Sequence, residues 1–344
     1  MRNNFYNFTI TALKALLIDN GFKAFNADQI YKWVYEQNEK NPENMSNLSK
    51  ELRQFLEENF YFTNLELVKR QDSKTGTHKY LFRLEDGIVI ESVLMQQVYG
   101  LSLCVTSQAG CSMGCSFCAS GLINKQRDLT VYELVSQIIS VQDDLKVKIT
   151  HVVVMGTGEP FDNYDNVMDF LKIINHKHGL QIGSRHITVS TCGIVPKIYD
   201  FAKEEIKANL AISLHAPNNE LRNKLMKINK VYPVQDVIQA SKDYFEITKR
   251  RVTFEYILLK NVNDEIHHAN ELSDLIRGIN CYVNLIPYNP VDEFGYEKTD
   301  MIRANRFYQQ LVKRGINVTL RKEMGSDIDA ACGQLRLKRH KETK

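Results

Sequence analysis

The sequence lacks any uninterrupted apolar run that approaches the roughly 20 residues needed to span a bilayer, so we expect no membrane-spanning segment among its 344 residues. It also lacks a recognisable signal peptide. Its first apolar segment, residues 5–18, is interrupted by Asn7 and Lys14 and precedes no small-residue cleavage site. We therefore expect this segment to form an amphipathic helix and the chain to remain in the cytoplasm.

The sequence also has no strong excess of positive or negative side chains. Lysine and arginine number 44 against 41 aspartates and glutamates, a net charge of +3 that is too small to indicate a nucleic-acid partner by itself. Any basic binding surface must therefore be local. With 43% hydrophobic and 25% charged residues, the composition excludes disordered, collagen-like and low-complexity chains and suffices for one or two globular cores.

The cysteine pattern of a secreted, disulfide-bonded domain is also absent. The cysteines number seven, which is odd, and they are spread along the chain. They are Cys104, Cys111, Cys115, Cys118, Cys192, Cys281 and Cys332. This pattern predicts reduced thiols that are available for metal or redox chemistry.

Two segments of different periodicity precede the main body of the chain. Residues 1–62 carry apolar side chains at helical spacing, which predicts a small helical N-terminal domain. Residues 63–98 instead contain short alternating runs on either side of Asp86 and Gly87. Because Asp-Gly is a strong hairpin-turn signal, we expect a short β connector there.

Residues 99–325 alternate strand-like apolar runs with stretches of helix length. The predicted strands are residues 151–155, 186–190, 208–214, 251–258, 282–286 and 316–320. This repetition predicts an α/β fold with a parallel sheet and right-handed crossovers. About six such units are too few for a complete eight-fold barrel but suit a partial (βα)6 barrel, with functional residues at the carboxyl ends of the strands.

The last segment, residues 326–344, is predicted to be a C-terminal loop that ends in a basic tail. Residues 336–344 are basic and carry no hydrophobic pattern. A solvated tail and an arm that contacts RNA are equally compatible with this composition.

The strongest local signal is the spacing C-x3-C-x2-C, formed by Cys111, Cys115 and Cys118 just after a short predicted strand. Zinc would usually require a fourth cysteine or histidine nearby, and none follows at finger-like spacing. A 4Fe–4S cluster held by only three cysteines leaves one iron open to a substrate or cofactor. The motif therefore favours such a cluster, with a structural zinc loop or three unrelated thiols as the alternatives.

This spacing, with the aromatic Phe117 directly before the third cysteine, resembles the radical S-adenosylmethionine (SAM) superfamily, whose open iron binds the amine and carboxylate of SAM. Residues 155–160, MGTGEP, resemble that superfamily's loop for the SAM amino group. In such a loop glycine permits a close backbone approach, and a carboxylate can accept a hydrogen bond from the ammonium group. The resemblance implies the radical SAM form of the partial barrel, a 4Fe–4S cluster and bound SAM.

Further segments resemble the RlmN/Cfr family of RNA adenine methyltransferases. They are residues 190–194 (STCGI), 213–215 (SLH), 284–290 (NLIPYNP) and 327–335 (DIDAACGQL). Pro160 favours the RlmN branch of this family over the Cfr branch. The sequence departs from the pattern at Thr157, where methionine is usual, and in residues 121–127, which lack a second glycine that relatives often carry.

The resemblance implies a set of SAM-binding residues, each at or just after the end of a predicted strand. They are Gly158, Glu159, Ser190, Ser213, Leu214, His215 and Asn289. For Ser190 an alternative remains open, because a serine hydroxyl at this position could instead cap the following helix.

The implied chemistry explains why a cysteine outside the cluster is needed. Carbon 2 of adenine is not a nucleophile, so a radical route is required. The resemblance implies that Cys332 accepts a methyl group from a first SAM, that a second SAM generates the radical, and that Cys332 becomes transiently linked to the RNA. It assigns Glu91 as the proton acceptor and Cys104 as the thiol that resolves the link through a disulfide with Cys332. Without the resemblance, Glu91 would be an outward strand residue and Cys104 a buried core thiol.

The implied substrate is carbon 2 of an adenosine in the peptidyl-transferase region of 23S rRNA, with a tRNA anticodon-loop adenosine as a second substrate. A monomer served by a flavodoxin- or ferredoxin-type electron donor is expected, and residues 249–251 are one candidate phosphate-binding group. Three alternatives remain: carbon 8 methylation of the Cfr type, which confers antibiotic resistance; a radical SAM activase that acts on a protein; and a non-enzymatic iron–sulfur module that binds RNA or senses redox state. An activase would have no need for Cys332, Cys104 and Glu91, and a non-enzymatic module would leave the SAM-type motifs without a purpose.

Overall fold

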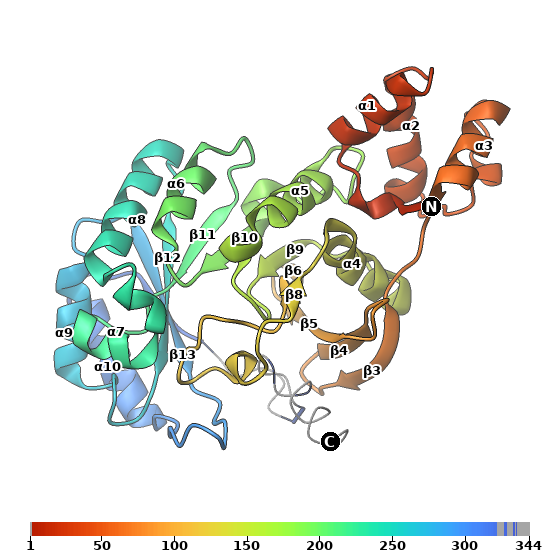
Figure 1. The fold of residues 1–344 in the computed structure, drawn as a ribbon. Helices are drawn as coiled ribbons and strands as arrows, with labels where there is room; N and C mark the ends of the chain where they lie inside the picture. The colour runs from red at the N-terminus through yellow and green to blue at the C-terminus, as the bar shows by residue number, and fades with distance from the viewer. Residues whose placement is uncertain (1, 322–326, 329–332, 334, 336–344) are drawn as a thin grey trace.

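The computed structural model describes residues 2–321, 327, 328, 333 and 335, so Cys332 and the basic tail lie outside the described residues. Its N-terminal part is a small group of helices (Figure 1). They are the 3-10 turn η1 (Phe5–Asn7), α1 (Ile10–Asp19), α2 (Phe25–Tyr31), the π turn η2 (Lys32–Glu36) and α3 (Lys50–Asn59).

The single helix expected over residues 5–18 is divided in the structure, and Thr9 is the reason. Its hydroxyl accepts a hydrogen bond from the backbone N of Ala12 at 3.2 Å. An N-cap of this kind starts a new helix, because the cap residue itself adopts extended backbone angles. The sequence prediction of one continuous helix was therefore wrong, although both pieces are helical.

The N-terminal helices are attached to the main body by polar contacts with one aspartate. Asp143, on helix α4 (Val131–Leu145), accepts hydrogen bonds from the side chains of Asn38, Lys40 and Asn64, each at 2.7 Å. The backbone N of Tyr132, at the start of the same helix, donates to Asn7 at 2.9 Å. Helix α4 is thus the element on which the N-terminal module docks.

One sheet of ten strands organises the rest of the described chain. In spatial order its strands are β14 (Val318–Leu320), β13 (Cys281–Pro287), β12 (Val252–Leu258), β11 (Asn209–Ser213), β10 (Ile187–Thr191), β9 (His151–Val154), β6 (Gly100–Val105), β5 (Val89–Gln97), β4 (Thr77–Arg83) and β3 (Glu66–Asp72). Neighbouring strands from β6 to β14 are parallel. From β3 to β6 they are antiparallel.

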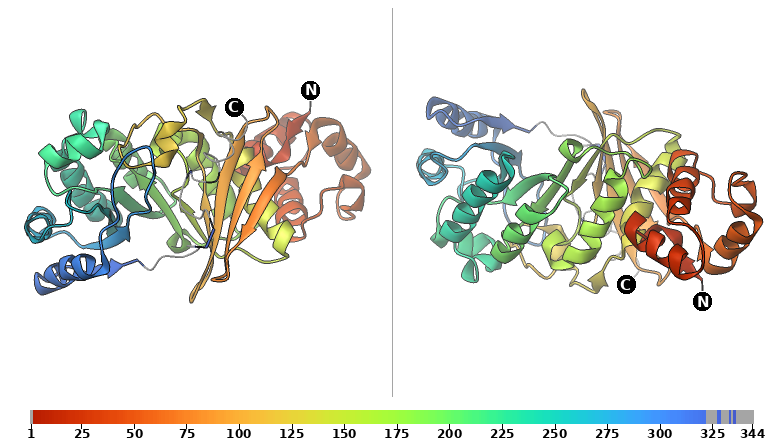
Figure 2. Two further views of the ribbon diagram at one scale, coloured as in Figure 1. Left: turned by 90° about the horizontal axis from the view of Figure 1, so that it is seen from below. Right: turned by 90° about the horizontal axis from the view of Figure 1, so that it is seen from above.

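Helices connect the parallel strands and lie along the outer face of the curved sheet (Figures 1 and 2). Besides α4 they are α5 (Tyr164–Asn175), α6 (Val195–Lys203), α7 (Asn219–Leu225), α8 (Val234–Thr248), α9 (Ile266–Leu275) and α10 (Met301–Lys313). The six βα units from β6 to α10, followed by β14, confirm the predicted α/β partial barrel.

The strands of the parallel half agree closely with the sequence predictions. Every predicted strand from residue 151 onward coincides with one of β9 to β14 to within two residues at each end. The predicted hairpin is β4–β5, in which Gly87 adopts a positive φ of 85°. Periodicity did not indicate that β3, β4 and β5 would continue the same sheet through β6. Among the described residues, no helix is both long and apolar enough to cross a bilayer.

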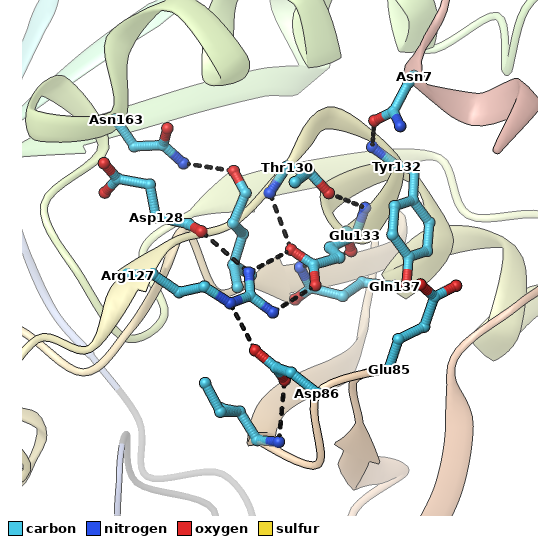
Figure 3. Close-up of polar contacts among 12 residues, drawn as sticks. Asn7, Glu85, Asp86, Arg127, Asp128, Thr130, Tyr132, Glu133, Gln137 and Asn163 are labelled. Carbon is cyan, nitrogen blue, oxygen red and sulfur yellow. Dashed lines mark hydrogen bonds and ion pairs between the residues drawn. The ribbon is translucent and has the colours of Figure 1, made fainter. Parts of the chain in front are cut away.

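Arg127 joins the hairpin to the start of α4 (Figure 3). It donates to Asp86 at 2.7 Å and to both carboxylate oxygens of Glu133 at 2.7 and 2.8 Å. Glu133 also accepts from the backbone N of Thr130, whose hydroxyl accepts from the backbone N of Glu133. This reciprocal cap fixes the first turn of α4 and the end of the loop that carries the cysteine motif.

Candidate active site at the carboxyl ends of the strands

The cysteine motif lies in the loop that follows β6 and the short strand β7 (Gln108–Ala109). The backbone N of Ser116 donates to the carbonyl of Leu225 at 3.0 Å, which attaches the loop to the end of α7. Phe117, predicted as the aromatic residue before the third cysteine, is buried and packs edge-to-face on His215 with ring centroids 5.0 Å apart. The loop is therefore held against the carboxyl ends of the strands, as predicted.

The three thiols of this loop interact electrostatically. Burial raises the pKa of Cys111 to about 11, and negative charge on Cys118 adds to the effect. Burial raises the pKa of Cys115 further, with Cys118 and Cys111 again contributing. Thiolates crowded in this way need a cationic group to remain deprotonated, and an iron–sulfur cluster supplies one.

The three cysteines are compatible with the predicted cluster. In the part of the chain that the structure describes, no three histidine, cysteine, aspartate or glutamate side chains are arranged to hold one metal ion together. The cysteines of a 4Fe–4S cluster each bind a different iron, so they do not have to converge on one point. Three neighbouring thiols on one loop thus fit the predicted cluster.

The loop after β9 requires its glycines. A Cβ atom at Gly156 would lie 2.7 Å from the carbonyl oxygen of Val105, and one at Gly158 would lie 2.6 Å from the Cβ of Gln108. Gly158 also has a positive φ of 109°. Between them, Thr157 is buried and its hydroxyl lies 3.3 Å from that of Ser120, so the departure from methionine places a polar side chain beside the cysteine loop.

Glu159 is buried at the centre of the strand ends, where it links two loops. Its carboxylate accepts hydrogen bonds from the backbone N of Cys192 at 2.7 Å and of Phe161 at 3.1 Å. Burial nevertheless raises the pKa of this carboxyl group. The side chains of Cys192 and Thr191 also hydrogen-bond to this carboxylate, which is therefore anchored on two sides.

The serines predicted to bind SAM lie on adjacent strands. The hydroxyls of Ser190 and Ser213, at the ends of β10 and β11, are 3.5 Å apart. The alternative role of Ser190 as a helix cap is not fulfilled, because α6 begins after Ile194 without a side-chain cap. Leu214 is fully buried, whereas Asn289 follows β13 and is exposed. The structure therefore gathers the predicted residues along one edge of the sheet.

His215 is held as a neutral imidazole. Its Nδ1 accepts a hydrogen bond from the backbone N of Ile257 at 3.1 Å, and its φ of 58° is unusual for a residue other than glycine. Burial, with a smaller contribution from the charge of Arg222, lowers its pKa to about 3. Since Nδ1 is the acceptor, the proton of the neutral ring is on Nε2, which can donate to a ligand.

Sequence reasoning did not single out Arg222, which lies close to this group of residues. Its side chain is fully buried, and its guanidinium donates to the carbonyls of Cys192 at 2.6 Å, Leu214 at 3.2 Å and Ser213 at 3.3 Å. These carbonyls belong to the loops that carry the predicted SAM-binding residues. Nothing in the pattern of helix α7 distinguishes this arginine from a surface residue.

Glu91, predicted for proton removal, lies on β5, and Cys104, predicted to resolve the link to the RNA, lies on β6. Glu91 is buried, so the alternative of an outward strand residue was wrong. Its Oε2 accepts from the Nζ of Lys79 at 2.9 Å and from the backbone N of Gly333 at 2.7 Å. Cys104 pairs with Val93 in the antiparallel register. Because side chains alternate along a strand, Cys104 and Glu91 share one face of the sheet.

Comparisons with known proteins identify the family. A radical SAM superfamily model matches residues 105–272, and a model described as the ribosomal RNA large subunit methyltransferase N-terminal domain matches residues 3–62. The probable dual-specificity RNA methyltransferase RlmN of Listeria welshimeri is 53% identical over 99% of this chain and 95% of its own length. The chain belongs to the RlmN family of radical SAM methyltransferases. The RlmN-family protein of Staphylococcus carnosus is 50% identical over 98% of this chain and 93% of its own.

A solved structure supports the same conclusion about the fold. The radical SAM methyltransferase from Sphaerobacter thermophilus has a TM-score of 0.89 and 41% identity, and the match covers 96% of this chain and 98% of that one. Membership of the RlmN family implies a 4Fe–4S cluster and SAM, which the residues at the strand ends fit. The described cysteines form no disulfide with one another, and the predicted disulfide involves Cys332, which lies outside the described residues.

Proposed function

We propose that this chain methylates carbon 2 of an adenosine in the peptidyl-transferase region of 23S rRNA, and of an adenosine in a tRNA anticodon loop. The names of the curated relatives, dual-specificity RNA methyltransferases, support an RNA substrate of two kinds. Their RlmN names and Pro160, which begins the buried turn after Glu159, favour carbon 2 over the carbon 8 chemistry of the Cfr branch.

One contact carries the proposal most directly. Gly333, the residue that follows Cys332 in the sequence, donates its backbone N–H to the Glu91 carboxylate at 2.7 Å. A Cβ atom on Gly333 would lie 2.9 Å from the backbone N of Ser120, two residues after the last cluster cysteine. Gly333, next in sequence to the proposed methyl carrier, therefore lies against both the proposed base and the proposed cluster loop.

The proposed cofactor site follows from the residues at the strand ends. Cys111, Cys115 and Cys118 would bind three irons of the cluster, and two molecules of SAM would be used per turnover. When bound, the cluster supplies the electron that cleaves SAM to a 5′-deoxyadenosyl radical. The polar and backbone groups at the strand ends would hold SAM in place and exclude water. They are Gly158, Glu159, Ser190, Ser213, Leu214, His215 and Asn289.

The remaining steps use side chains of this protein. The Cys332 thiolate would attack the methyl carbon of one SAM and displace S-adenosylhomocysteine, so that the methyl group is carried on the Cys332 sulfur. After the 5′-deoxyadenosyl radical has taken a hydrogen atom from the S-methyl group of Cys332, the methylene carbon would bond to carbon 2 of adenine. The adduct would then give one electron to the electron carrier that serves the cluster, and the Glu91 carboxylate would take the proton from carbon 2. The Cys104 thiolate would attack the Cys332 sulfur and break its bond to the methylene carbon, which takes up a proton to become the methyl group. This step leaves a transient disulfide that an external thiol reduces.

The wider organisation is part of the proposal. We assign residues 1–62 to an accessory domain, 63–98 to the β connector, 99–325 to the radical SAM core and 326–344 to the C-terminal loop and tail. A flavodoxin- or ferredoxin-type protein would deliver the electrons, and the protein would act as a monomer in the cytoplasm.

Mass spectrometry of nucleosides tests the proposed reaction. The anaerobically reconstituted protein is incubated with SAM, a reductant and either a 23S rRNA fragment or tRNA, and the RNA is digested to nucleosides. We expect 2-methyladenosine from both RNAs. Appearance of 8-methyladenosine would place the activity in the Cfr class, whereas SAM cleavage without a methylated nucleoside would contradict an RNA methyltransferase.

A further inference from the structure

Arg222 occupies an unusual position for a charged residue. It lies on α7, its side chain is fully buried, and all of its hydrogen-bond acceptors are neutral. Three acceptors are the backbone carbonyls of the strand-end loops described above. The others are the side-chain oxygen of Asn229 at 3.0 Å and the carbonyl of Tyr232 at 3.4 Å.

This arrangement leaves a full positive charge in the interior without a carboxylate acceptor among the described residues. A guanidinium does not lose its proton at any physiological pH. Burial of such a charge is costly unless an opposite charge lies nearby, and buried arginines therefore usually pair with aspartate or glutamate. The carbonyl dipoles satisfy the hydrogen bonds of Arg222 but do not balance its charge.

The surroundings of Arg222 indicate where the balancing charge would be. Leu221 and Leu225, which flank Arg222 on the same helix, belong to one apolar cluster with Phe117, and the side chain of Cys115 packs against this cluster. Cys115 is one of the proposed cluster ligands. Moreover, the carbonyl of Leu225, one turn along α7, accepts from the backbone N of Ser116 in the cluster loop. The helix that carries the charge is thus attached to the loop that would carry the cluster.

We propose that Arg222 is the internal counter-charge of the thiolate-ligated cluster and raises its reduction potential. The inference rests on the proposed function, because it requires that the three cysteines hold a cluster. Each thiolate adds a negative charge, and reduction adds one electron more. A fixed positive charge nearby therefore stabilises the reduced cluster more than the oxidised cluster. Arg222 would be a positioning and tuning residue behind the SAM-binding loops, not a catalytic residue.

Three variants separate the charge of Arg222 from its hydrogen bonds. Arg222→Gln removes the charge and keeps an amide donor, whereas Arg222→Lys keeps the charge and loses the planar fork. Lys224→Gln, two residues along the same helix, is the matched control, because it removes a positive charge from a side chain that is 66% exposed. Each reconstituted protein is titrated anaerobically with titanium(III) citrate, without SAM or RNA, and the reduced cluster is quantified by electron paramagnetic resonance.

We expect the reduction potential of the cluster to change only in the variant that loses the buried charge. At a fixed solution potential, Arg222→Gln should have a ratio of reduced to oxidised cluster that is about tenfold lower than that of the wild-type protein, which corresponds to about 59 mV for one electron. Arg222→Lys and Lys224→Gln should stay within about twofold of the wild-type ratio. Iron and sulfide content and circular dichroism of each variant establish that the cluster and the fold are present.

Other outcomes overturn the inference or support it in a different way. Equal ratios in Arg222→Gln and the wild-type protein, at equal cluster content, would show that the charge does not act on the cluster. If Arg222→Gln folds but holds no cluster while Arg222→Lys does, the requirement for charge is supported; if both folded variants hold none, the hydrogen bonds are responsible and the inference fails. A wild-type protein that binds no 4Fe–4S cluster would instead contradict the proposed function itself.

Discussion

Two contacts of Glu91 define its chemical environment. Its Oε2 lies 2.9 Å from the Nζ of the fully buried Lys79 and 2.7 Å from the backbone N of Gly333. Both contacts orient the carboxylate, which still has acceptor positions for a proton from a substrate. The same contacts fix the carboxylate against the segment next to Cys332.

We expect Glu91→Gln to reduce formation of methylated RNA at least a hundredfold, because glutamine cannot take a proton. Methylation of Cys332 should remain, since it precedes proton removal. Peptide and nucleoside mass spectrometry of one reaction mixture measures both products. Glu66→Gln on the exposed strand β3 is the control and should retain activity. Normal RNA methylation by Glu91→Gln would exclude this residue as the base.

His215 predicts a pH dependence of stability. Its pKa in the folded protein is lowered to about 3, mainly by burial, whereas an unfolded imidazole titrates near 6.5. Between these values the unfolded chain binds a proton that the folded chain does not bind. Above pH 6.5 neither state binds this proton, so the free energy of unfolding has its full value. As the pH falls from 6.5 toward 3, protonation of the unfolded chain lowers the free energy of unfolding.

We expect His215→Asn, which tolerates the positive φ, to reduce the loss of stability between pH 7 and pH 5 by about 2 kcal/mol. Urea unfolding of the wild-type protein and of the variant at both pH values measures this difference. An unchanged pH dependence would mean that His215 is protonated in the folded state.

For single residues, the sequence indicated which side chains are candidates for the chemistry better than it indicated which side chains are buried. The spacing of the cysteines indicated a candidate cluster, and motif resemblance indicated Glu159 and Glu91 as candidate site residues. Arg222 and Lys79 were not indicated, because a single charged residue in a short helix or an alternating strand has the same local pattern whether it is buried or exposed. Only the tertiary contacts reveal that these two cations are inside.

The loop after β9 requires glycine at position 158, because of its backbone conformation and its close neighbours. Gly158→Ala would place a methyl group 2.6 Å from Gln108 in a backbone conformation with φ of 109°. We expect a loss of about 1–3 kcal/mol in the free energy of unfolding and at least a tenfold loss of SAM affinity. The control is Gly183→Ala, because Gly183 has φ of −60° and open space around its Cα. Equal effects of both substitutions, measured by chemical unfolding and SAM binding, would contradict this account.

The first turn of α4 supplies a second test at the level of elements. Glu133→Gln removes the charge that Arg127 contacts with two nitrogens and leaves the guanidinium facing only Asp86. Because Glu133 is almost completely buried, we expect a loss of about 2 kcal/mol in the free energy of unfolding. Glu220→Gln, which breaks an exposed ion pair on α7, should cause no measurable change. A similar stability of both variants would show that the network does not hold α4.

Elements were more predictable than residues, and the reason is periodicity. Parallel strands such as β9 are short apolar runs and helices such as α5 have apolar faces, so their positions follow from the sequence. The break at Thr9 was missed because the apolar pattern continues on both sides of a cap. The pairing of β5 with β6 was missed because period-two alternation identifies a strand but not its neighbour.

For the whole molecule, the continuous sheet explains how distant segments form one site. The antiparallel half provides Glu91 and Cys104, while the parallel half provides the cluster loop and the strand-end loops. Strand β6 belongs to both halves, because it pairs with β5 on one side and with β9 on the other. Gly333, near the end of the chain, contacts residues of both halves. The site therefore depends on the complete fold and not on one segment.

The central claim is that Cys104 resolves a covalent link between Cys332 and the RNA, and Cys104→Ala tests it most directly. The variant is incubated anaerobically with SAM, a reductant and a 23S rRNA fragment, and the products are separated on a denaturing gel and digested for mass spectrometry. We predict that an RNA–protein adduct accumulates and that the modified peptide contains Cys332. Cys281→Ala, which removes a buried cysteine at the first residue of β13, should give free methylated RNA. Free methylated RNA from Cys104→Ala at the wild-type rate, without an adduct, would contradict the account.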